Sequence, residues 1–301
     1  MSDQNKTGSE KSIFFSIIIP VLNSGESLVK CLEGIACQSY EDHEIVFVDG
    51  ASTDHTLAVI QDFQAVNNHI RIKIISGPDK GIYDAMNKGI ATAEGQWLYF
   101  MGSDDRFYSS AVLRLVADEI TKGPVDLIYG NVEGVSSKTR YVYDTLAKVL
   151  AVGIHHQSAF YCARLFRELG KYDLNFRIAS DYHFTLKVFL NRQYITKYIN
   201  TDIAYYGEAG YSSRHFDYKL FSGHYRLLST RGRINELDDP EKCFNDSIYC
   251  CLYLAGQKQY LGTAWSNLLY YVTAVKGLKF SERLRTTLRM LVWTLKPSSQ
   301  P

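Results

Sequence analysis

One stretch in the first half of the chain constrains the fold more than any other. Residues 96–105 read QWLYFMGSDD, a continuous apolar run that ends in a turn and two adjacent carboxylates. A short apolar run of this kind is typical of a strand that is covered on both faces of a sheet. Ligands of open α/β sheets bind just beyond the carboxyl ends of the strands. We therefore expect Asp104 and Asp105 to border a binding site.

The two adjacent carboxylates favour a bound cation. They repel each other, and burying them with neither a cation nor a hydrogen-bond donor is costly. Their oxygen atoms suit Mg²⁺ or Mn²⁺, shared with a phosphate group. The alternative is that one of them caps a helix expected near residues 109–122. The pair alone leaves both interpretations open.

Other segments predict strands that alternate with helices. The predicted strands, rich in β-branched and aromatic residues, are 14–21, 43–50, 70–77 and 125–130. Asn23 and Glu26 resemble a capping box that opens the first helix, and Asp54 is expected to cap the second. This alternation predicts an α/β fold with a mainly parallel sheet and right-handed crossovers.

Polar residues follow the predicted strands and should meet at one edge of the sheet. They are Asn23, Asp49, Asp79 and the pair Asp104 and Asp105. Several acids at one edge repel unless they share cations or donors, and a nucleotide with its phosphates and metal supplies both. Neither GxGxxG nor GxxxxGK[ST] occurs, so neither a dinucleotide fold nor a P-loop is predicted. The diphosphate is then expected to rely on the metal and on bases such as Lys80.

Composition narrows the class of protein. A formal net charge of +1 over 301 residues argues against broad nucleic-acid binding, and no nucleic-acid partner is expected. The six cysteines form no CxxC pair and predict reduced thiols in a cytosolic protein. No stretch approaches the ~18 to 20 apolar residues of a transmembrane helix. Residues 1–12 are polar, and we expect a disordered tail without a signal peptide.

Four motifs, in order, carry a resemblance to a known family. They are SIIIPVLN (16–23), VDGASTD (48–54), PDKGIYDAMNKG (78–89) and GSDD (102–105). Together they resemble family 2 glycosyltransferases, and most of all the bacterial members that build O-antigen, capsule or colanic-acid-type polysaccharides. The resemblance covers residues 14–210 and is far more specific for the family than for the substrate.

The resemblance implies a GT-A fold and inverting transfer from a nucleotide-sugar. Carried over by motif, the residues expected to bind the nucleotide-sugar are Pro20, Val21, Asn23, Glu26, Asp49, Ser52, Asp79, Lys80, Gly81 and Asp104. Among them Asp49 would contact the base, and Asp104 the ribose or donor sugar. The family's metal motif is Asp-x-Asp, which here reads Ser103-Asp104-Asp105 with the first acid missing. Asp105 thereby takes the place of the ligand to Mn²⁺ or Mg²⁺.

The second half of the chain supplies a candidate base. IHHQSAFY (154–161) and RIASDYH (177–183) also resemble the family, in which an acid at the start of a helix is the catalytic base. Asp181 takes that place, and the commoner Glu-Asp pair reads Ser180-Asp181 here. A carboxylate there can take the proton of an acceptor hydroxyl as it attacks the anomeric carbon. The alternative is that Asp181 caps a helix over 182–189. His156 is expected either to contact the diphosphate or acceptor or to be structural.

The C-terminal part predicts a flap and helices. Residues 203–213 predict a strand and a glycine-containing loop that suit an acceptor-site flap, with Glu208 in it. The last helix, 281–295, would carry Leu284, Leu288, Leu291 and Leu295 on one face. The basic residues nearby are Lys276, Lys279, Arg283, Arg285, Arg289 and Lys296. Such a helix can lie on an anionic membrane, or it packs against the protein's own core with its charges solvated.

The expected organisation is a tail (1–12), a GT-A domain (13–213) and a helical extension (214–301). The GT-A domain would divide into a nucleotide-binding part (13–135) and an acceptor part (136–213). We expect an enzyme on the cytoplasmic face of the inner membrane, with a UDP- or GDP-linked donor and a lipid-linked saccharide acceptor.

Two other classes of protein are weighed against this one. A sugar-phosphate nucleotidyltransferase would need a glycine-rich basic loop after the first strand, and PVLNSG (20–25) lacks the basic residues. The other alternative is a non-catalytic nucleotide-sugar-binding subunit, and the presence of Asp105 and Asp181 argues against it.

Overall fold

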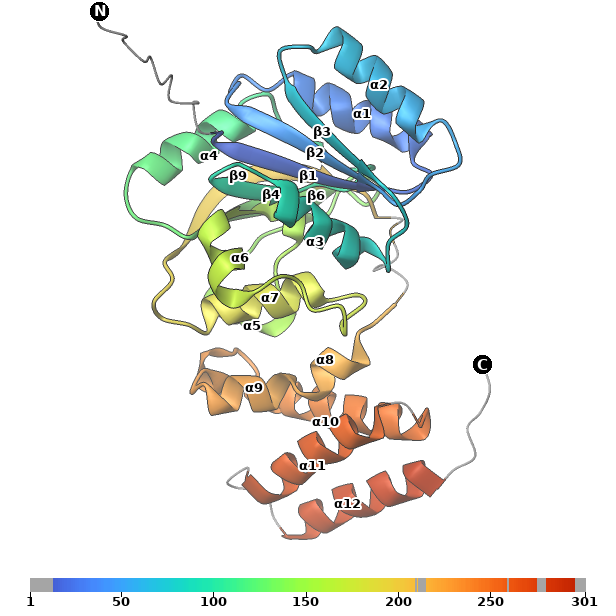
Figure 1. Ribbon diagram of the computed structural model, residues 1–301. Coiled ribbons are helices and arrows are strands. Elements are labelled where there is room, and N and C mark those ends of the chain that lie inside the picture. Colours follow the sequence, from blue (N-terminus) through green and yellow to red (C-terminus); the bar gives the residue numbers. More distant parts are fainter. Residues whose placement is uncertain (1–12, 209, 211–214, 259, 275–279, 296–301) are drawn as a thin grey trace, which may run out of the picture. The chain divides into compact units, whose positions relative to one another are not determined.

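The computed structural model describes residues 13–208, 210, 215–258, 260–274 and 280–295 (Figure 1). The chain divides into two compact units, and each combines several segments. The first contains the described residues up to Val142 together with His155–Lys171 and Tyr194–Glu208. The second contains Tyr143–Ile154, Tyr172–Gln193 and the described residues from 210 onward. The predicted boundaries at residues 135 and 213 stay a prediction.

The first unit is built on one mixed sheet. Its described strands are β1 (Phe15–Val21), β2 (His43–Asp49), β3 (Arg71–Ser76), β4 (Trp97–Phe100), β5 (Arg106–Phe107), β6 (Leu127–Gly134), β7 (Arg140–Tyr141), β8 (Ala159–Cys162) and β9 (Thr196–Tyr206). Their order is β3-β2-β1-β4-β8-β6-β9-β5, and β7 pairs with β6. The first four strands run parallel, whereas β8 is antiparallel to both β4 and β6. The predicted α/β fold with a mainly parallel sheet is therefore confirmed.

Helices cover both faces of this sheet (Figure 1). They are α1 (Gly25–Ala36), α2 (Thr56–Val66), α3 (Ile82–Thr92), α4 (Val112–Thr121) and α6 (Ala163–Leu169). Buried side chains of α1 and α4 pack with Ile17 and Ile19 of β1. Ile18 points to the opposite face because side chains alternate along a strand. There α3 comes so close that a Cβ on Gly89 would lie 2.4 Å from Ile18 Cγ2.

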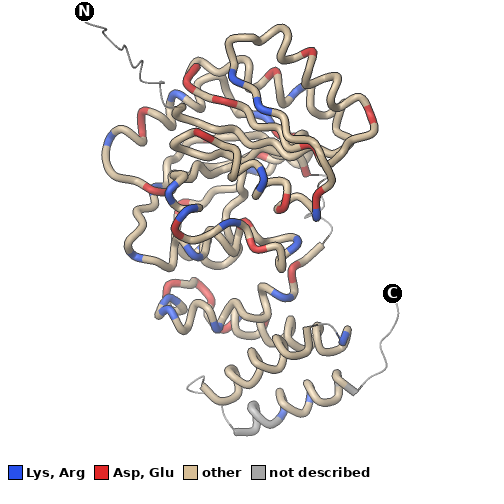
Figure 2. The backbone as a smooth tube through the Cα atoms, viewed as in Figure 1, with Lys and Arg blue, Asp and Glu red and all other residues tan. Residues whose placement is uncertain are grey.

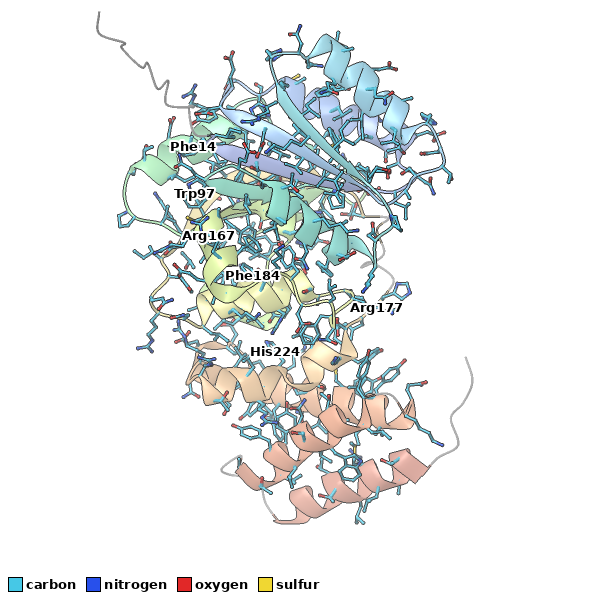
Figure 3. The ribbon with its side chains drawn as sticks, in the orientation of Figure 1. Phe14, Trp97, Arg167, Arg177, Phe184 and His224 are labelled. Atoms are coloured by element: carbon cyan, nitrogen blue, oxygen red, sulfur yellow. The ribbon has the colours of Figure 1, made fainter. Side chains whose placement is uncertain are left out.

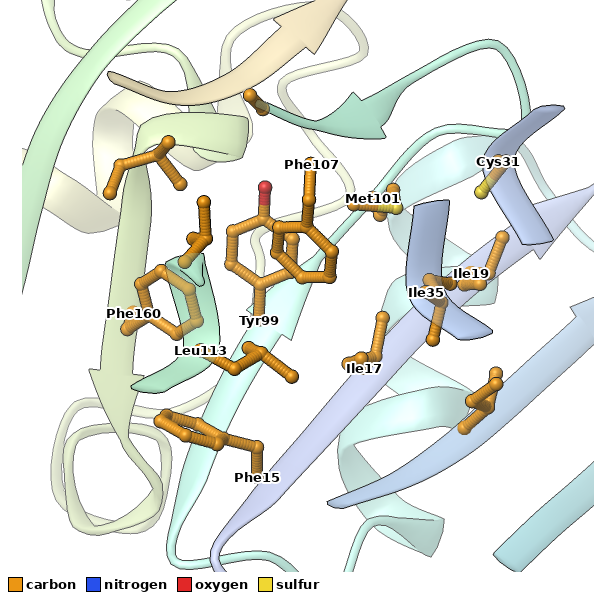
Figure 4. Packing of buried hydrophobic residues seen from close by; sticks show 14 of the residues in the cluster. Phe15, Ile17, Ile19, Cys31, Ile35, Tyr99, Met101, Phe107, Leu113 and Phe160 are labelled. Atoms are coloured by element: carbon orange, nitrogen blue, oxygen red, sulfur yellow. The ribbon is translucent and has the colours of Figure 1, made fainter. Parts of the chain in front are cut away.

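Strand β4 forms the centre of the core, as its apolar run predicts. Its four residues are all buried, and Tyr99 is completely buried. The Tyr99 ring is stacked on Phe107 at 5.0 Å and on Phe160 at 4.4 Å between ring centroids (Figure 4). Because aromatic rings bury large areas, this stack fixes the end of β4 from which Asp104 and Asp105 follow.

The second unit is helical. Its described helices are α5 (Leu146–Val152), α7 (Ser180–Phe189), α8 (Tyr218–Ser222), α9 (His224–Thr230), α10 (Pro240–Gly256), α11 (Leu261–Ala274) and α12 (Phe280–Leu295). Helix α10 begins with proline, and the side chain of Asp239 accepts a hydrogen bond from the Lys242 N–H. Helix α11 carries no charged residue, as the uncoloured tube in Figure 2 shows.

Among the described side chains of helix α12, one lies in a small core. Met290 is completely buried among residues of α10 and α11. By contrast, Leu288, Leu291 and Val292 are 51%, 44% and 53% exposed. The side chains of Leu284, Leu295 and Arg283, like residues Lys276, Lys279 and Lys296, lie outside the described residues. Within the described residues, no helix is both long enough and apolar enough to cross a bilayer.

Candidate functional site

The loops after β1 and β2 hold each other. Asn23 has a positive φ of 48°, which asparagine tolerates better than most residues. Its Oδ1 accepts a hydrogen bond from the Thr53 N–H (2.9 Å), and its own N–H donates to Ser52 Oγ (2.8 Å). The predicted capping box of Asn23 and Glu26 is wrong, because α1 begins only at Gly25. Its first N–H groups bond instead to the neighbouring loop, as Gly25 does to Asp54 Oδ2 (3.1 Å).

Asp49 closes β2 as a buried, hydrogen-bonded carboxylate. It accepts hydrogen bonds from the Ser52 N–H (3.0 Å) and the Ser76 hydroxyl (2.6 Å). Burial alone raises the pKa of Asp49, but the hydrogen bonds from Ser52 and Ser76 outweigh it and the net pKa is lowered. The group is therefore a fixed negative charge at the carboxyl end of β2.

The loop after β3 brings a second acid, Asp79, against Gly50, the residue after Asp49. A Cβ on Gly50 would lie 2.7 Å from Asp79 Oδ2, so glycine at this position lets the carboxylate approach β2. Asp79 Oδ1 accepts a hydrogen bond from the Gly81 N–H (2.8 Å), and Gly81 has a φ of 113°. Lys80, which lies between Asp79 and Gly81 in the chain, is exposed. The loop thus presents the Asp79 carboxylate and the exposed ammonium group of Lys80 at the edge where β2 and β3 end.

The other predicted nucleotide-binding residues differ in exposure. Glu26 is exposed, Pro20 is half-buried and Val21 is only 3% exposed. The Val21 carbonyl accepts a hydrogen bond from the Gly50 N–H (2.9 Å). The Val21 side chain therefore lies in the core, and only its main chain is available at the edge where β1 ends.

The two acids after β4 have opposite surroundings. Asp105 is 1% exposed, and three N–H groups surround its carboxylate. Oδ2 accepts from the Gly102 N–H (2.6 Å) and the Gln157 side chain (2.9 Å), and Oδ1 accepts from the Gly207 N–H (2.8 Å). Burial, and next the charge of Asp104, raise the pKa of Asp105. Asp104 is exposed, and its carboxylate contacts the main chain of Gly207.

These surroundings decide which acid fits a divalent cation. Both Asp105 oxygens accept hydrogen bonds, and the side chain is almost completely covered. Its geometry does not fit the predicted metal role. Asp104 fits, because its carboxylate is exposed. No cluster of three or more metal-binding side chains occurs in the described part of the chain. Mg²⁺ and Mn²⁺ sites with one protein carboxylate take their other oxygens from phosphates and water.

Gln157 is a site residue that the sequence interpretation missed. It lies in a short 3₁₀ turn, His156–Ser158, that leads into β8. Its side chain bonds to Asp105, and its carbonyl accepts a hydrogen bond from the Tyr99 hydroxyl (2.8 Å). The adjacent His156 lies close enough to lower the pKa of Asp105 through its charge. The only sequence signal was the place of Gln157 inside the IHHQSAFY motif.

Glu208 is hydrogen-bonded to other residues of the first unit. Its Oε2 accepts hydrogen bonds from the Ser136 and Ser137 N–H groups, both at 2.7 Å. Hydrogen bonding by Ser137 lowers the pKa of Glu208. The carboxylate therefore closes the turn after β6, and most of the predicted flap, residues 209 and 211–214, lies outside the described residues.

Asp181 belongs to the second unit. It is half-buried in the first turn of α7, whose N-cap is Ala179, and its Oδ1 accepts a hydrogen bond from the Tyr182 N–H (2.8 Å). Asp181 is therefore not the N-cap residue, although it binds one N–H group of the first turn. The next residue, Tyr182, is buried and donates a hydrogen bond to the Leu150 carbonyl (2.7 Å). Its hydroxyl also lies 2.8 Å from Nε2 of His224, labelled at the start of α9 in Figure 3. Helix α7 is therefore anchored directly beside the predicted base.

Comparisons with known proteins fit this geometry. The family model described as glycosyl transferase family 2 matches residues 16–214. The PGL/p-HBAD biosynthesis glycosyltransferase of Mycobacterium bovis (strain BCG / Pasteur 1173P2) is 41% identical over 199 residues, which cover 65% of this chain and 77% of the relative.

Two solved structures share the fold. TarS 1–349 from S. aureus in complex with UDP-GlcNAc has a TM-score of 0.67 at 18% identity, covering 93% of this chain and 89% of that one. The mannosyltransferase PcManGT from Pyrobaculum calidifontis in complex with GDP-Man and Mn²⁺ has a TM-score of 0.55 at 18% identity, covering 93% and 85%. At this identity the likeness concerns the fold, which is the expected GT-A architecture.

Proposed function

Because the chain belongs to glycosyl transferase family 2, we propose that it transfers a sugar, with inversion, from a nucleotide-sugar to a hydroxyl group of a saccharide acceptor. Family membership and the named relatives make it a glycosyltransferase. The alternatives of a nucleotidyltransferase and a non-catalytic subunit are therefore set aside. The observation that carries the proposal is the position of the Asp79 carboxylate against Gly50, the residue after Asp49 at the end of β2, with Asp104 exposed after β4.

Each of these groups has a chemical role in the proposal. Asp49 is completely buried with both oxygens hydrogen-bonded by Ser52 and Ser76, so in the proposal it attracts the N–H groups of a base through its charge and holds the loop that borders the base. Asp79 can accept from ribose hydroxyls, and Lys80 can attract the diphosphate. A divalent cation, which structural neighbours and the family suggest, would be held by Asp104 and would add positive charge at the leaving diphosphate.

The proposed chemistry is a single displacement. The acceptor oxygen forms a bond to the anomeric carbon while the bond from that carbon to the phosphate oxygen breaks. The bonding electrons leave with the nucleoside diphosphate, and the hydroxyl proton passes to the carboxylate of Asp181. Support for Asp181 as the base is its half-buried place in the first turn of α7, outside the capping position.

A donor panel tests the proposal. Purified protein is incubated with UDP-, GDP- and dTDP-sugars and Mn²⁺ or Mg²⁺, and nucleotide release is measured with and without acceptor saccharides. Asp181→Asn should lower transfer about 10²- to 10⁴-fold and leave nucleotide binding nearly intact. Asp62→Asn, on the exposed side of α2, is the matched control and should be fully active. Failure of the wild type to turn over any donor would refute the proposed function.

We further propose that the acceptor is lipid-linked and that α12 touches the cytoplasmic face of the membrane. Support comes from Leu288 and Val292, which are exposed next to the exposed Arg285 and Arg289. An apolar strip flanked by arginines suits an anionic bilayer surface.

Co-sedimentation with phosphatidylglycerol vesicles tests the contact. Leu288→Glu should reduce binding, whereas Val66→Glu, at a still more exposed apolar position on α2 of the first unit, should not. Equal binding of both variants would contradict the membrane contact. Deleting residues 278–301 is a coarser version of the same test, because it also removes Met290 from the core.

A further inference from the structure

Three segments far apart in the sequence meet at one buried carboxylate. Asp105 accepts hydrogen bonds from Gly102 in the loop after β4, from Gln157 before β8 and from Gly207 after β9. Gln157 and Gly207 are 52 and 102 positions away in the chain. A buried ionised carboxylate needs such donors, and charge-assisted hydrogen bonds are stronger than neutral ones. Asp105 therefore ties together the ends of three strands of one sheet.

This arrangement is anchored in the core. Gln157 offers its carbonyl to the hydroxyl of Tyr99, which is itself stacked between two aromatic rings. The Gln157 side chain donates to Asp105, and the Gln157 main chain accepts from Tyr99 of β4. The core therefore holds the amide donor in place. Gln157 is only 7% exposed, so this contact is shielded from water.

The same arrangement presses Gly207 against the neighbouring acid. Its N–H bonds to Asp105, and a Cβ at Gly207 would lie 1.9 Å from Oδ2 and 2.2 Å from Cγ of Asp104. The exposed carboxylate of Asp104 thus rests directly on the main chain that Asp105 holds. Any movement of Gly207 changes the space that Asp104 can occupy.

We propose that Asp105 is a positioning residue: locked by Gln157 and Gly207, it fixes the carboxylate of Asp104 toward the donor diphosphate and its cation and does not bind the cation itself. This inference rests on the proposed function. It gives Gln157 a role in the reaction. It also gives the cation to Asp104, whereas the Asp-x-Asp pattern suggested Asp105.

The two possible roles of Asp105 predict different results when Gln157→Met is compared with Asp105→Asn. Gln157→Met preserves length and volume and leaves the Asp105 carboxylate intact with one donor fewer. If Asp105 positions Asp104, the variant should bind Mn²⁺ about 10- to 100-fold more weakly in the presence of UDP, as loss of a supporting hydrogen bond typically does. If Asp105 were the ligand, Gln157→Met would also weaken Mn²⁺ binding, but Asp105→Asn would abolish it and Asp104→Asn would retain part of it, which would overturn the positioning role.

Mn²⁺ binding to the protein with UDP is measured by electron paramagnetic resonance, and kcat and KM by nucleotide release. Asp105→Asn, Gln157→Met and the double variant should weaken Mn²⁺ binding to a similar extent, because all three break one unit. Asp104→Asn should abolish the metal-dependent part of UDP binding. Asp62→Asn is the control, and circular dichroism with metal-free UDP binding shows that each variant is folded.

Two outcomes separate this inference from the proposed function. Wild-type protein that binds Mn²⁺ with UDP and turns over a donor, next to a Gln157→Met variant with unchanged Mn²⁺ binding, overturns the positioning role and leaves the function standing. Wild-type protein that neither binds Mn²⁺ with UDP nor turns over a donor overturns both. Independent, additive effects of Asp105→Asn and Gln157→Met would also overturn the positioning role.

Discussion

The contact between α3 and the sheet depends on one missing methyl group. In Gly89→Ala the new Cβ would lie 2.4 Å from Ile18 Cγ2 and 3.4 Å from Val48 Cγ2. Carbon atoms pack at roughly 3.5 to 4.0 Å, so α3 or Ile18 has to move by about 1 Å. Overpacking of this kind costs about 1 to 3 kcal/mol, and alanine returns about 1 kcal/mol of helix propensity. The expected net loss of unfolding free energy is up to about 2 kcal/mol.

Urea denaturation followed by circular dichroism measures this loss, and two further variants isolate its cause. Gly262→Ala lies in α11, where a Cβ meets no atom within 4 Å, so it should be neutral or stabilise by up to about 1 kcal/mol. Ile18→Ala removes the methyl group that Gly89→Ala would meet. In that background Gly89→Ala should cost nothing, which gives a coupling energy of up to about 2 kcal/mol.

The effect should also reach nucleotide binding, because α3 follows directly on Lys80 and Gly81. Weaker UDP binding is expected from Gly89→Ala and not from Gly262→Ala. If Gly89→Ala stabilised the protein as Gly262→Ala does, in both the wild-type and the Ile18→Ala backgrounds, the close approach of α3 to β1 would be refuted.

Three further predictions follow from individual contacts. Gly207→Ala should push Asp104 aside and raise the Mn²⁺ concentration for half-maximal transfer about tenfold, whereas Gly210→Ala, whose Cβ meets nothing, should not; equal curves would contradict the contact. Tyr182→Phe removes one of two groups that bond to the Leu150 carbonyl, the other being His224 Nε2, and should lower the unfolding free energy in urea by about 0.5 to 1.5 kcal/mol; a value near zero would argue against this anchor of α7. Burial lowers the pKa of His224 to about 4, so below pH 6.5 the unfolded chain binds a proton that the folded one does not. Stability should fall with pH between 6.5 and 4 by about 1.4 kcal/mol per unit, and His224→Gln should remove that share of the slope.

The sequence was most informative where burial determines the pattern. Strands β1, β2 and β4 are covered on both faces, so their apolar runs mark them clearly. The ends of β2 and β3 meet because parallel strands share an edge, and that rule predicted that Asp79 would lie near the end of β2, where its carboxylate faces Gly50.

Long-range hydrogen bonds were beyond the reach of the sequence. The predicted capping box failed because the N–H groups of Ser24 and Gly25, at the start of α1, bond to Thr56 at the start of α2 and to Asp54 just before it, about 30 positions away. The difference between Asp104 and Asp105 depends on Gln157 and Gly207, which follow much later in the chain. Neighbouring residues of the same type look alike until the partners of each are known.

The position of β8 has a consequence for how the protein is made. This strand lies between β4 and β6 in the sheet, although it follows both in the chain. When a ribosome has released β6, the sheet still has a gap at its centre, with two unpaired edges that expose backbone groups to other chains. Only after residues 159–162 emerge can the two halves join, and β9 must follow to cover β6. Nascent chains that stall before this point should depend on chaperones to avoid aggregation.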